Sequence, residues 1–504
     1  MIEIIFSSIP SVWPEIILAL TFVLAMVVEF ILGRKGRMYS GVPTGMVVLL
    51  GFVLALLALA FTGSEPRELF GAMYAIDPFS VFFKVLIIAT GIVIIVFSLQ
   101  SGELKQQGSM GEFFCFLAAT TVGMVLMSGA TNLLMMYMAL EMVSIPSYVL
   151  AGFSKKHRRS GEAALKYVLF GGASSGVMLY GISLLFGLTG SLELSSIQAT
   201  LSSGAVAHNV GGYIVLIIAL IMITAGFGYK ISAVPFHFWT PDVYEGSPIA
   251  VTAFLAVASK AAGFAMMIRF FYVTFFDALL DPGRWASLPY VEWNLIVAVL
   301  SVLTMTLGNL VAIWQDNLKR MLAYSSIAHA GYILMGLVVM SDLGIASMLM
   351  YFMVYYFMNL GAFYIVMVVA DKIGSEHIDD YNGLAKRAPL IALGFSVFLV
   401  SLTGLPPLAG FIGKWMLFSA VMDGQFYWLA IIGVINSAIS LYYYARVMRN
   451  MYLRDAKPGN DGDLRFAPSV TIVALVFIVP TIVFGLYWGP LVSIAQRSVE
   501  IFLR

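Results

Sequence analysis

The stretch Ala225–Pro248, "AGFGYKISAVPFHFWTPDVYEGSP", places a charge and a helix break side by side in an otherwise apolar segment. Lys230 follows a long run of mostly apolar residues, and five residues later Pro235 ends any simple helix. A lysine that only anchored a helix at a membrane surface would need no break beside it. The pair of features therefore predicts a broken membrane helix with a polar site at its break.

The composition of the whole chain predicts an all-α polytopic membrane protein. The chain has 504 residues, of which 61% are hydrophobic and 11% charged, whereas soluble proteins have about a quarter charged residues. The net charge of +1 gives no indication of a nucleic-acid partner. The single cysteine, Cys115, excludes a disulfide framework and a CxxC metal site. The first apolar run is interpreted as a retained span and not as a signal peptide.

Hydropathy predicts fourteen transmembrane helices. The expected spans are 13–32, 42–61, 79–99, 112–130, 132–153, 161–188, 211–246, 247–273, 293–313, 318–339, 345–370, 389–422, 426–448 and 469–494. The seventh and the twelfth are too long for one crossing and contain Pro235 and the Pro406–Pro407 pair, respectively. Each of the two is therefore predicted to be one discontinuous helix.

The distribution of basic residues predicts the orientation. The loops that follow odd-numbered spans hold 18 Lys and Arg residues, among them Arg34, Lys35 and Arg37, whereas the termini and the other loops hold 4. Basic loops face the cytoplasm. Both termini are therefore expected on the outer, periplasmic side of a bacterial inner membrane.

Six basic residues fall inside the expected spans. Lys84 and Arg269 lie near span ends, where long side chains are expected to snorkel to the interface. The other four lie within the spans together with one acidic residue: Lys166, Lys230, Lys260, Lys414 and Glu141. Because each charge at the centre of a membrane costs about 2.5–3.5 kcal/mol, this set is predicted to have a function.

An internal repeat organises these residues. The segments starting at Thr131 ("TNLLMMYMALEMVSIPSYVLAGF") and at Asp316 ("DNLKRMLAYSSIAHAGYILMGL") fall into rough register at an offset of 185, and Lys230 and Lys414 are 184 residues apart. Spans 4–8 and 9–13 are therefore expected to be two five-helix repeats, inverted because five is odd. Breaks at matching positions of inverted repeats indicate an ion path near the membrane centre.

The expected division of the chain follows from this repeat. Residues 1–110 would hold three N-terminal helices, 111–275 the first repeat, 276–452 the inverted second repeat, and 453–504 the last loop and helix.

Buried lysines suit proton transfer. The pKa of lysine starts near 10.4, desolvation lowers it, and a nearby carboxylate raises it again. A buried lysine with a movable glutamate partner is therefore a switch. Glu141 lies about nine residues, or about 14 Å, into the fifth span, and it is the expected partner of Lys230. Lys166 lies close to the cytoplasmic edge, where its side chain could also snorkel.

Two histidines are candidates for relaying protons: His329 in the tenth span and His237 just after the first break. The sequence has no phosphate-binding loop, no dinucleotide fingerprint, and no haem or iron–sulfur ligand set. We therefore expect no cofactor or metal bound by this chain, no redox centre and no catalytic nucleophile.

Four motifs together resemble the antiporter-like membrane subunits of respiratory complex I, the proton-translocating NADH–quinone oxidoreductase, and most of all its subunit N group. They are "ALEMVSIPSYVLAGF" (139–153), "GFGYKISAVPFHFWTPDVYEGSP" (226–248), "DNLKRMLAYSSIAHAGYILMGL" (316–337) and "TGLPPLAGFIGKW" (403–415). The resemblance covers essentially the whole chain. It implies fourteen helices, an inverted five-helix repeat, and a place in the membrane arm beside sister antiporter-like subunits and the lipid bilayer.

The resemblance also implies roles. Glu141 and Lys230 would form a coupling ion pair that Lys166 tunes. Lys260 and His329 would carry protons along the central axis, and Lys414 would be the terminal donor toward the outer face. NADH, FMN, the iron–sulfur clusters and quinone would belong to other subunits.

Two other classes of protein remain open from the residues. A subunit of a multi-subunit Na⁺/H⁺ antiporter or of a membrane-bound hydrogenase would share this lysine pattern. A purely structural membrane scaffold is disfavoured by the five buried charges.

Overall fold

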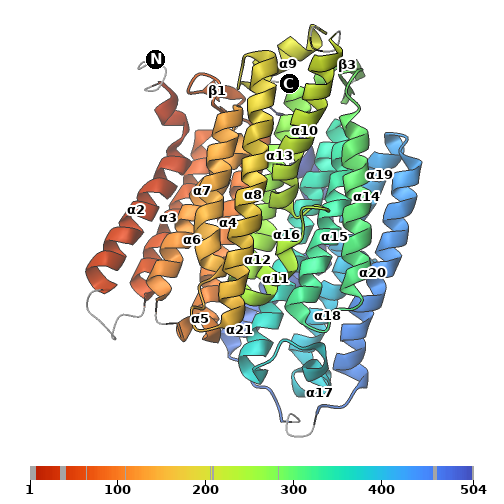
Figure 1. Cartoon of the computed structure of the whole chain (residues 1–504). Helices are drawn as coiled ribbons and strands as arrows, with labels where there is room; N and C mark the ends of the chain where they lie inside the picture. Colours follow the sequence, from red (N-terminus) through yellow and green to blue (C-terminus); the bar gives the residue numbers. More distant parts are fainter. Residues whose placement is uncertain are drawn as a thin grey trace.

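The computed structural model describes residues 7–33, 41–63, 65–107, 109–204, 206, 209–281, 283–457 and 462–501. Its helices run roughly side by side in one bundle (Figure 1). In the described part of the chain, thirteen helices are long and apolar enough to cross a membrane. The prediction of an α-helical polytopic membrane protein is therefore confirmed.

Twelve of these thirteen are single uninterrupted helices: α2 (Trp13–Gly33), α3 (Val42–Thr62), α4 (Pro78–Gln100), α6 (Met110–Gly129), α7 (Leu133–Ala151), α8 (Arg158–Thr189), α10 (Val210–Ile231), α14 (Trp293–Ala312), α15 (Leu318–Val338), α16 (Asp342–Ile373), α20 (Tyr427–Leu453) and α21 (Pro468–Leu486). The thirteenth, Ile249–Thr274, consists of α12 (Ile249–Phe254), a π-helical turn η3 (Leu255–Ser259) and α13 (Lys260–Thr274). Short helices lie before, between and after them: η1 (Ile9–Ser11), α5 (Gly102–Lys105), α9 (Leu194–Ser202), η4 (Ile378–Tyr381), α17 (Leu384–Arg387) and α22 (Gly489–Arg497).

Both segments predicted to be discontinuous are broken. After α10, a non-helical stretch leads to α11 (Trp239–Gly246), and α18 (Pro389–Thr403) is separated in the same way from α19 (Ala409–Asp423). Each of α18 and α19 has 15 residues, about 22 Å of helix, which is too short to cross a hydrocarbon core of about 30 Å.

The two breaks are built alike but are not in the expected register. A residue in the left-handed conformation caps each first half, Ser232 (φ 65°) after α10 and Gly404 (φ 85°) after α18. These caps are 172 residues apart, whereas Lys230 and Lys414 are 184 apart. The expectation that the offset of about 185 carries the seventh span onto the twelfth therefore does not hold for the breaks, because Lys230 precedes its break and Lys414 follows its own.

Other parts of the two halves keep the expected offset. The starts of α7 and α15 are 185 residues apart, and α8 and α16 both have 32 residues and start 184 apart. The inversion of the repeat and the division at residues 110, 275 and 452 stay predictions.

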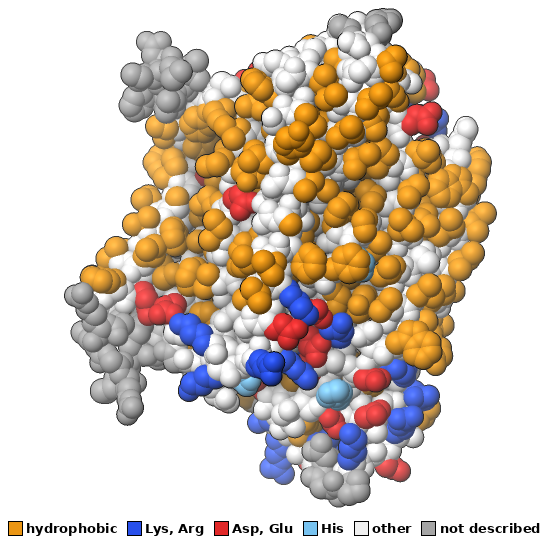
Figure 2. Space-filling model, viewed as in Figure 1, with side chains coloured by type: hydrophobic (Ala, Val, Ile, Leu, Met, Phe, Trp, Pro, Cys, Tyr) orange, Lys and Arg blue, Asp and Glu red, His pale blue; other side chains and the backbone are white. Residues whose placement is uncertain are grey.

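The two ends of the bundle differ in charge. At one end, which we name the basic end, Lys and Arg side chains gather beside acidic ones, whereas the middle of the visible face is mostly hydrophobic (Figure 2). The basic end includes the start of α8 and the start of α15. Arg34, Lys35 and Arg37 lie outside the described residues.

Two small antiparallel hairpins mark the opposite end, which we name the hairpin end: β1 (Arg67–Leu69) with β2 (Tyr74–Ile76), and β3 (Phe276–Asp281) with β4 (Arg284–Ser287). The first described residues lie at this end, since the amide of Phe70 donates to Ser8 Oγ (3.1 Å). The last described residues do so as well, since the amide of Phe79 donates to the Glu500 carbonyl (3.3 Å).

Lys84 and Arg269 do not snorkel, contrary to expectation. Lys84 is 1% exposed and its Nζ lies 2.7 Å from Glu15 Oε1, to which the Tyr74 hydroxyl also donates (2.8 Å). Arg269 Nη1 lies 2.7 Å from Asp77 Oδ2, and both side chains are fully buried. The two basic groups remain inside because each has a carboxylate partner there, and the pairs join α2, α4 and α13.

The buried pair between Arg269 and Asp77 predicts a large effect of one substitution. Asp77→Asn keeps an N-cap for α4 but removes the negative charge, so the guanidinium of Arg269 is left buried without a counter-charge. We expect the free energy of unfolding in detergent to fall by about 3–5 kcal/mol. The matched control is Asp423→Asn, which removes the exposed partner of Arg284 and should cost about 1 kcal/mol or less. Equal losses in the two variants would contradict this assignment.

Candidate functional site

The first candidate pair lies between α7 and α10. Lys230, in the last turn of α10, is 1% exposed, and its Nζ donates to Ser144 Oγ on α7 (3.4 Å). Glu141 lies one turn before Ser144 on the same helix, half-buried, and its Oε1 has no hydrogen-bond partner among the described residues. The direct Glu141–Lys230 ion pair that the resemblance implied is thus not formed in this structure, and the hydroxyl of Ser144 is the contact of Lys230.

The break beside Lys230 is satisfied by protein groups. The amide of Ala233 donates to the Gly228 carbonyl (2.7 Å), and the amide of Val234 donates to Thr304 Oγ1 on α14 (2.9 Å). The Trp239 indole donates to the Tyr229 carbonyl (3.0 Å). These bonds let non-helical backbone persist inside the bundle around Pro235.

His237 lies in this broken stretch but apart from the lysines. It is 4% exposed, its ring centroid lies 4.6 Å from that of Phe238, and its Nδ1 has no hydrogen-bond partner among the described residues. The structure does not bring it into contact with Lys230.

Lys166 lies at the basic end and not beside Lys230. Its side chain is 34% exposed, and its Nζ lies 2.7 Å from Glu162 and 2.6 Å from Asp242 on α11. Asp242 also binds Arg320 at the start of α15, and Arg320 binds Glu245 (3.0 Å). The result is a chain of alternating charges that links α8, α11 and α15.

Lys260 is the first residue after the π-helical turn η3. It is 3% exposed, and its Nζ donates to the carbonyl (2.9 Å) and to the hydroxyl (2.6 Å) of Ser326 on α15. The Nζ also lies 5.9 Å from the ring centroid of Tyr244. The turn contains no Pro or Gly, so no residue pattern indicates it, although π-turns are frequent at functional sites.

His329 continues the polar contacts on α15, one turn after Ser326. Its Nδ1 lies 2.6 Å from the Tyr351 hydroxyl, and its Nε2 lies 3.4 Å from the Tyr444 hydroxyl. Tyr355 donates to Ser326 Oγ (2.8 Å). These tyrosines and serines were not among the residues predicted from the sequence. A signal was available, since buried tyrosine hydroxyls need partners, and Ser326, His329 and Tyr332 are spaced on one helix face.

Lys414 lies in α19, just after the break that contains Pro406 and Pro407. It is 3% exposed, and its Nζ donates to the Thr403 carbonyl at the end of α18 (2.7 Å) and to Ser437 Oγ on α20 (2.9 Å). The Nζ lies 4.5 Å from the ring centroid of Tyr332, which contributes a cation–π contact. The ammonium thus sits at the negative end of the α18 dipole.

Lys414 also lines a cavity of about 420 Å³ with Gly404, Trp415 and Ser437. The Lys414 side chain, although buried, therefore borders open space.

The four deep residues Lys230, Lys260, His329 and Lys414, which we name the row, belong to α10, α13, α15 and α19 of the bundle in Figure 1. Lys260 binds Ser326 of α15, and the ring of Tyr332 on α15 lies over Lys414. Lys260 and His329 each lie 11 residues, about 16 Å, from the start of their helical segments at Ile249 and Leu318, and so close to half of a core of about 30 Å. A Cβ on Gly263 would lie 3.1 Å from Cγ of Lys230, so α10 and α13 are in close contact.

A row of buried ionisable groups at mid-depth, between two broken helices, defines a class of protein: a membrane subunit that moves ions. Among the described residues, no group of three or more His, Cys, Asp or Glu side chains is arranged to hold a metal ion.

Comparison with known proteins agrees with this class. Residues 130–440 match the family described as "NADH:quinone oxidoreductase/Mrp antiporter, TM". NADH-quinone oxidoreductase subunit N 2 of Chloroherpeton thalassium is 44% identical over 494 residues, covering 97% of this chain and 94% of that protein. A chain of respiratory complex I from Thermus thermophilus is 31% identical, with a TM-score of 0.77 over 96% of this chain and 99% of that one.

The fold extends beyond complex I. A chain of the Mrp complex from Dietzia has a TM-score of 0.82 at 18% identity, covering 98% of both chains, which is a likeness of fold alone. The chain belongs to the NADH:quinone oxidoreductase/Mrp antiporter family, in the group of subunit N of NADH–quinone oxidoreductase.

The close approach of Gly404 to Lys414 predicts a sensitive position. A Cβ on Gly404 would lie 2.6 Å from Cδ of Lys414, and the residue has a positive φ that other residues rarely adopt. We expect Gly404→Ala to lower stability by about 1–3 kcal/mol through overpacking alone, seen as a lower midpoint of thermal denaturation. The control is Gly172→Ala on α8, where an added Cβ meets nothing within 4 Å. Equal midpoints for the two variants would refute this account of the break.

Proposed function

We propose that this protein is a proton-translocating membrane-arm subunit of an NADH–quinone oxidoreductase. The observation that carries the proposal is the row of Lys230, Lys260, His329 and Lys414, buried at mid-depth and contacted by serine and tyrosine hydroxyl groups. The relatives named subunit N support it. NADH oxidation and quinone reduction take place in other subunits, and this chain supplies no redox centre, cofactor site or catalytic nucleophile of its own.

Orientation follows from charge. The basic end faces the cytoplasm, because positively charged loops are retained there. The hairpin end, with the first and last described residues, faces the outer side of the bacterial inner membrane. Protons move from the basic end to the row and leave toward the outer face.

Glu141 and Lys230 act as the switch. In the present arrangement Lys230 contacts the neutral hydroxyl of Ser144, one helical turn from Glu141. When Glu141 moves onto Lys230, the ammonium gains a counter-charge and keeps its proton. When they separate, as here, a buried ammonium without a carboxylate releases its proton more easily. The Glu141 end of the row thus receives the signal from the rest of the complex.

Lys260, His329 and Lys414 hand the proton on. Ser326 binds Lys260 and lies one turn from His329, and the tyrosine hydroxyls around His329 lead toward Tyr332, whose ring lies over Lys414. Hydroxyl groups both donate and accept, so they can pass a proton in a chain with water. Lys414 is the terminal donor, beside the cavity described above. Lys166 tunes the switch through Asp242, and His237 has a supporting role at the break.

A subunit of a multi-subunit Na⁺/H⁺ antiporter or of a hydrogenase is not favoured. The Mrp chain shares the fold at 18% identity, whereas the relatives at 44% identity are subunits of NADH-quinone oxidoreductase. The partners of this chain are accordingly the other membrane-arm subunits of complex I, including sister antiporter-like subunits.

The switch predicts the behaviour of two substitutions. Lys230→Met and Glu141→Gln should each lower NADH-driven proton pumping by reconstituted complex about tenfold or more, since a positioned proton-transfer group contributes about 10²–10⁴-fold. Assembly, checked by NADH–ferricyanide activity, should be retained. Lys155→Met is the control, because that lysine is 76% exposed at the basic end. Full pumping in both switch variants would contradict the proposed roles.

The proposed proton path through His329 predicts a smaller effect on pumping when one of its hydroxyl groups is removed. Tyr351→Phe removes the hydroxyl that lies 2.6 Å from His329, and a hydrogen bond of about 1 kcal/mol corresponds to about fivefold in rate. We expect the pumping rate to fall about fivefold. Tyr356→Phe, on the same helix, removes a hydroxyl that makes no hydrogen bond with any described residue and should leave the rate unchanged. If the two variants pump equally, Tyr351 is not in the relay.

A further inference from the structure

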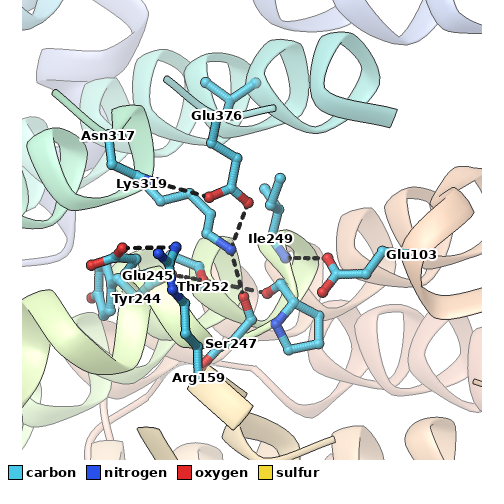
Figure 3. A network of polar contacts seen from close by, with 12 residues as sticks. Glu103, Arg159, Tyr244, Glu245, Ser247, Ile249, Thr252, Asn317, Lys319 and Glu376 are labelled. Carbon is cyan, nitrogen blue, oxygen red and sulfur yellow. Dashed lines mark hydrogen bonds and ion pairs between the residues drawn. The ribbon is translucent and has the colours of Figure 1, made fainter. Parts of the chain in front are cut away.

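A second group of charges, outside the row, lies at the basic end, where α5, α11, α12, α15 and the segment after α16 come together (Figure 3). Lys319, the second residue of α15, is 4% exposed. Its Nζ donates to the carbonyl of Ser247 in the turn between α11 and α12 (3.0 Å) and lies 2.8 Å from Glu376 Oε1, after α16. The side chain of Glu376 is 23% exposed, so it links the buried ammonium to the surface.

Glu103, in α5, reaches the same turn from the other side. Its carboxylate accepts from the amide of Ile249, the first residue of α12 (3.4 Å), and from the hydroxyl of Ser154 (3.3 Å). Both hydrogen bonds are long, so they hold the charged form only weakly. Burial raises the pKa of the Glu103 carboxyl, and the charged groups facing it are Lys319, which opposes that rise, and Glu376, which adds to it. Glu103 is thus a carboxyl that can bind a proton more readily than an exposed one.

The segment that Glu103 contacts leads to the row. Ile249 begins the stretch through α12 and η3 that ends at Lys260, about 16 Å along the helix axis. Thr252, one turn after Ile249, donates to the Tyr244 carbonyl (3.0 Å). The Tyr244 hydroxyl is buried and makes no hydrogen bond with any described residue, and its ring lies 5.9 Å from Lys260 Nζ. Polar groups therefore follow α11 and α12 from Glu103 to Lys260.

We propose that Glu103 is the proton-uptake group of this subunit and that it supplies Lys260. The carboxylate takes a proton from cytoplasmic water beside the Lys319–Glu376 pair. The resulting carboxylic acid gives this proton, through water and the Thr252 and Tyr244 hydroxyls, to the neutral amine of Lys260, and the carboxylate is restored. The inference rests on the proposed function, and it adds to it the route by which protons reach the row.

The rival explanation is purely structural. Glu103 and Lys319 bind the two sides of the turn from Ser247 to Ile249, so they could serve only to hold α12 in place. Glu103→Gln separates the two explanations, because its amide oxygen can still accept from the Ile249 amide and its NH2 group can donate to the Ser154 hydroxyl, but the amide cannot take up a proton at neutral pH. Glu103→Asp keeps an ionisable carboxyl on a shorter side chain.

The experiment uses intact complex in vesicles and compares the rate of NADH-driven proton pumping, with NADH–ferricyanide activity as the measure of assembly. We expect Glu103→Gln to assemble and to pump about tenfold more slowly, and Glu103→Asp to recover much of the rate. The matched control is Glu112→Gln, a half-exposed carboxyl at the same end whose nearest cation, Lys155, is 3.9 Å away, and it should pump normally.

Three outcomes would overturn the proposal. The first is normal pumping by Glu103→Gln while Lys260→Met stops pumping, which leaves the proposed function intact. The second is an equal loss of assembly in Glu103→Gln and Glu103→Asp, which indicates a structural role. The third is normal pumping by both Glu103→Gln and Lys260→Met, in which case the proposed function itself fails.

Discussion

The structure depends on one constraint: a peptide carbonyl inside a membrane bundle has to be hydrogen bonded by protein or by confined water. At the second break Lys414 meets this need directly, because its ammonium binds the Thr403 carbonyl that α18 leaves unpaired. At the first break the indole of Trp239 binds the Tyr229 carbonyl, and Lys230 lies in the adjoining turn. Charge and break therefore stabilise each other, since a helix C-terminus is where a buried ammonium costs least.

All three deep lysines contact a serine hydroxyl: Lys230 with Ser144, Lys260 with Ser326 and Lys414 with Ser437. A carboxylate in the same place would strongly favour the protonated lysine, and an apolar side chain would strongly favour the neutral amine. A hydroxyl accepts from an ammonium and donates to a neutral amine, so it serves both protonation states with little preference. In the proposed mechanism the serines leave the protonation of the lysines to be set by Glu141, which suits residues that would gain and lose a proton in each cycle.

The sequence was sufficient to predict the helical membrane fold from its long apolar runs. It was also sufficient to predict the two breaks and the deep lysines, because Pro and Lys residues within an apolar span are unfavourable and easily recognised. It was insufficient wherever a partner lies far away in the chain. Lys84 is buried beside Glu15, and Arg269 is buried beside Asp77. No local sequence pattern indicates pairs between residues so far apart in the chain. The predicted register of the two breaks was wrong for another reason. The prediction aligned Lys230 with Lys414, whereas the equivalent residues are the left-handed caps Ser232 and Gly404.

Electrostatics limits how the row can be occupied. Three lysines share a single carboxylate, Glu141, and each unpaired charge at mid-depth costs about 2.5–3.5 kcal/mol before any repulsion between neighbours. At Lys414 part of this cost is offset by the Thr403 carbonyl, the Ser437 hydroxyl and the ring of Tyr332. At Lys260 it is offset by the carbonyl and the hydroxyl of Ser326. A row with every lysine protonated is therefore the least stable state. In the proposed mechanism, a proton arriving at one site lowers the affinity of the next site for its own proton. In that mechanism, a movement of Glu141 would change proton binding at Lys230 and then, through each neighbouring site in turn, as far as Lys414.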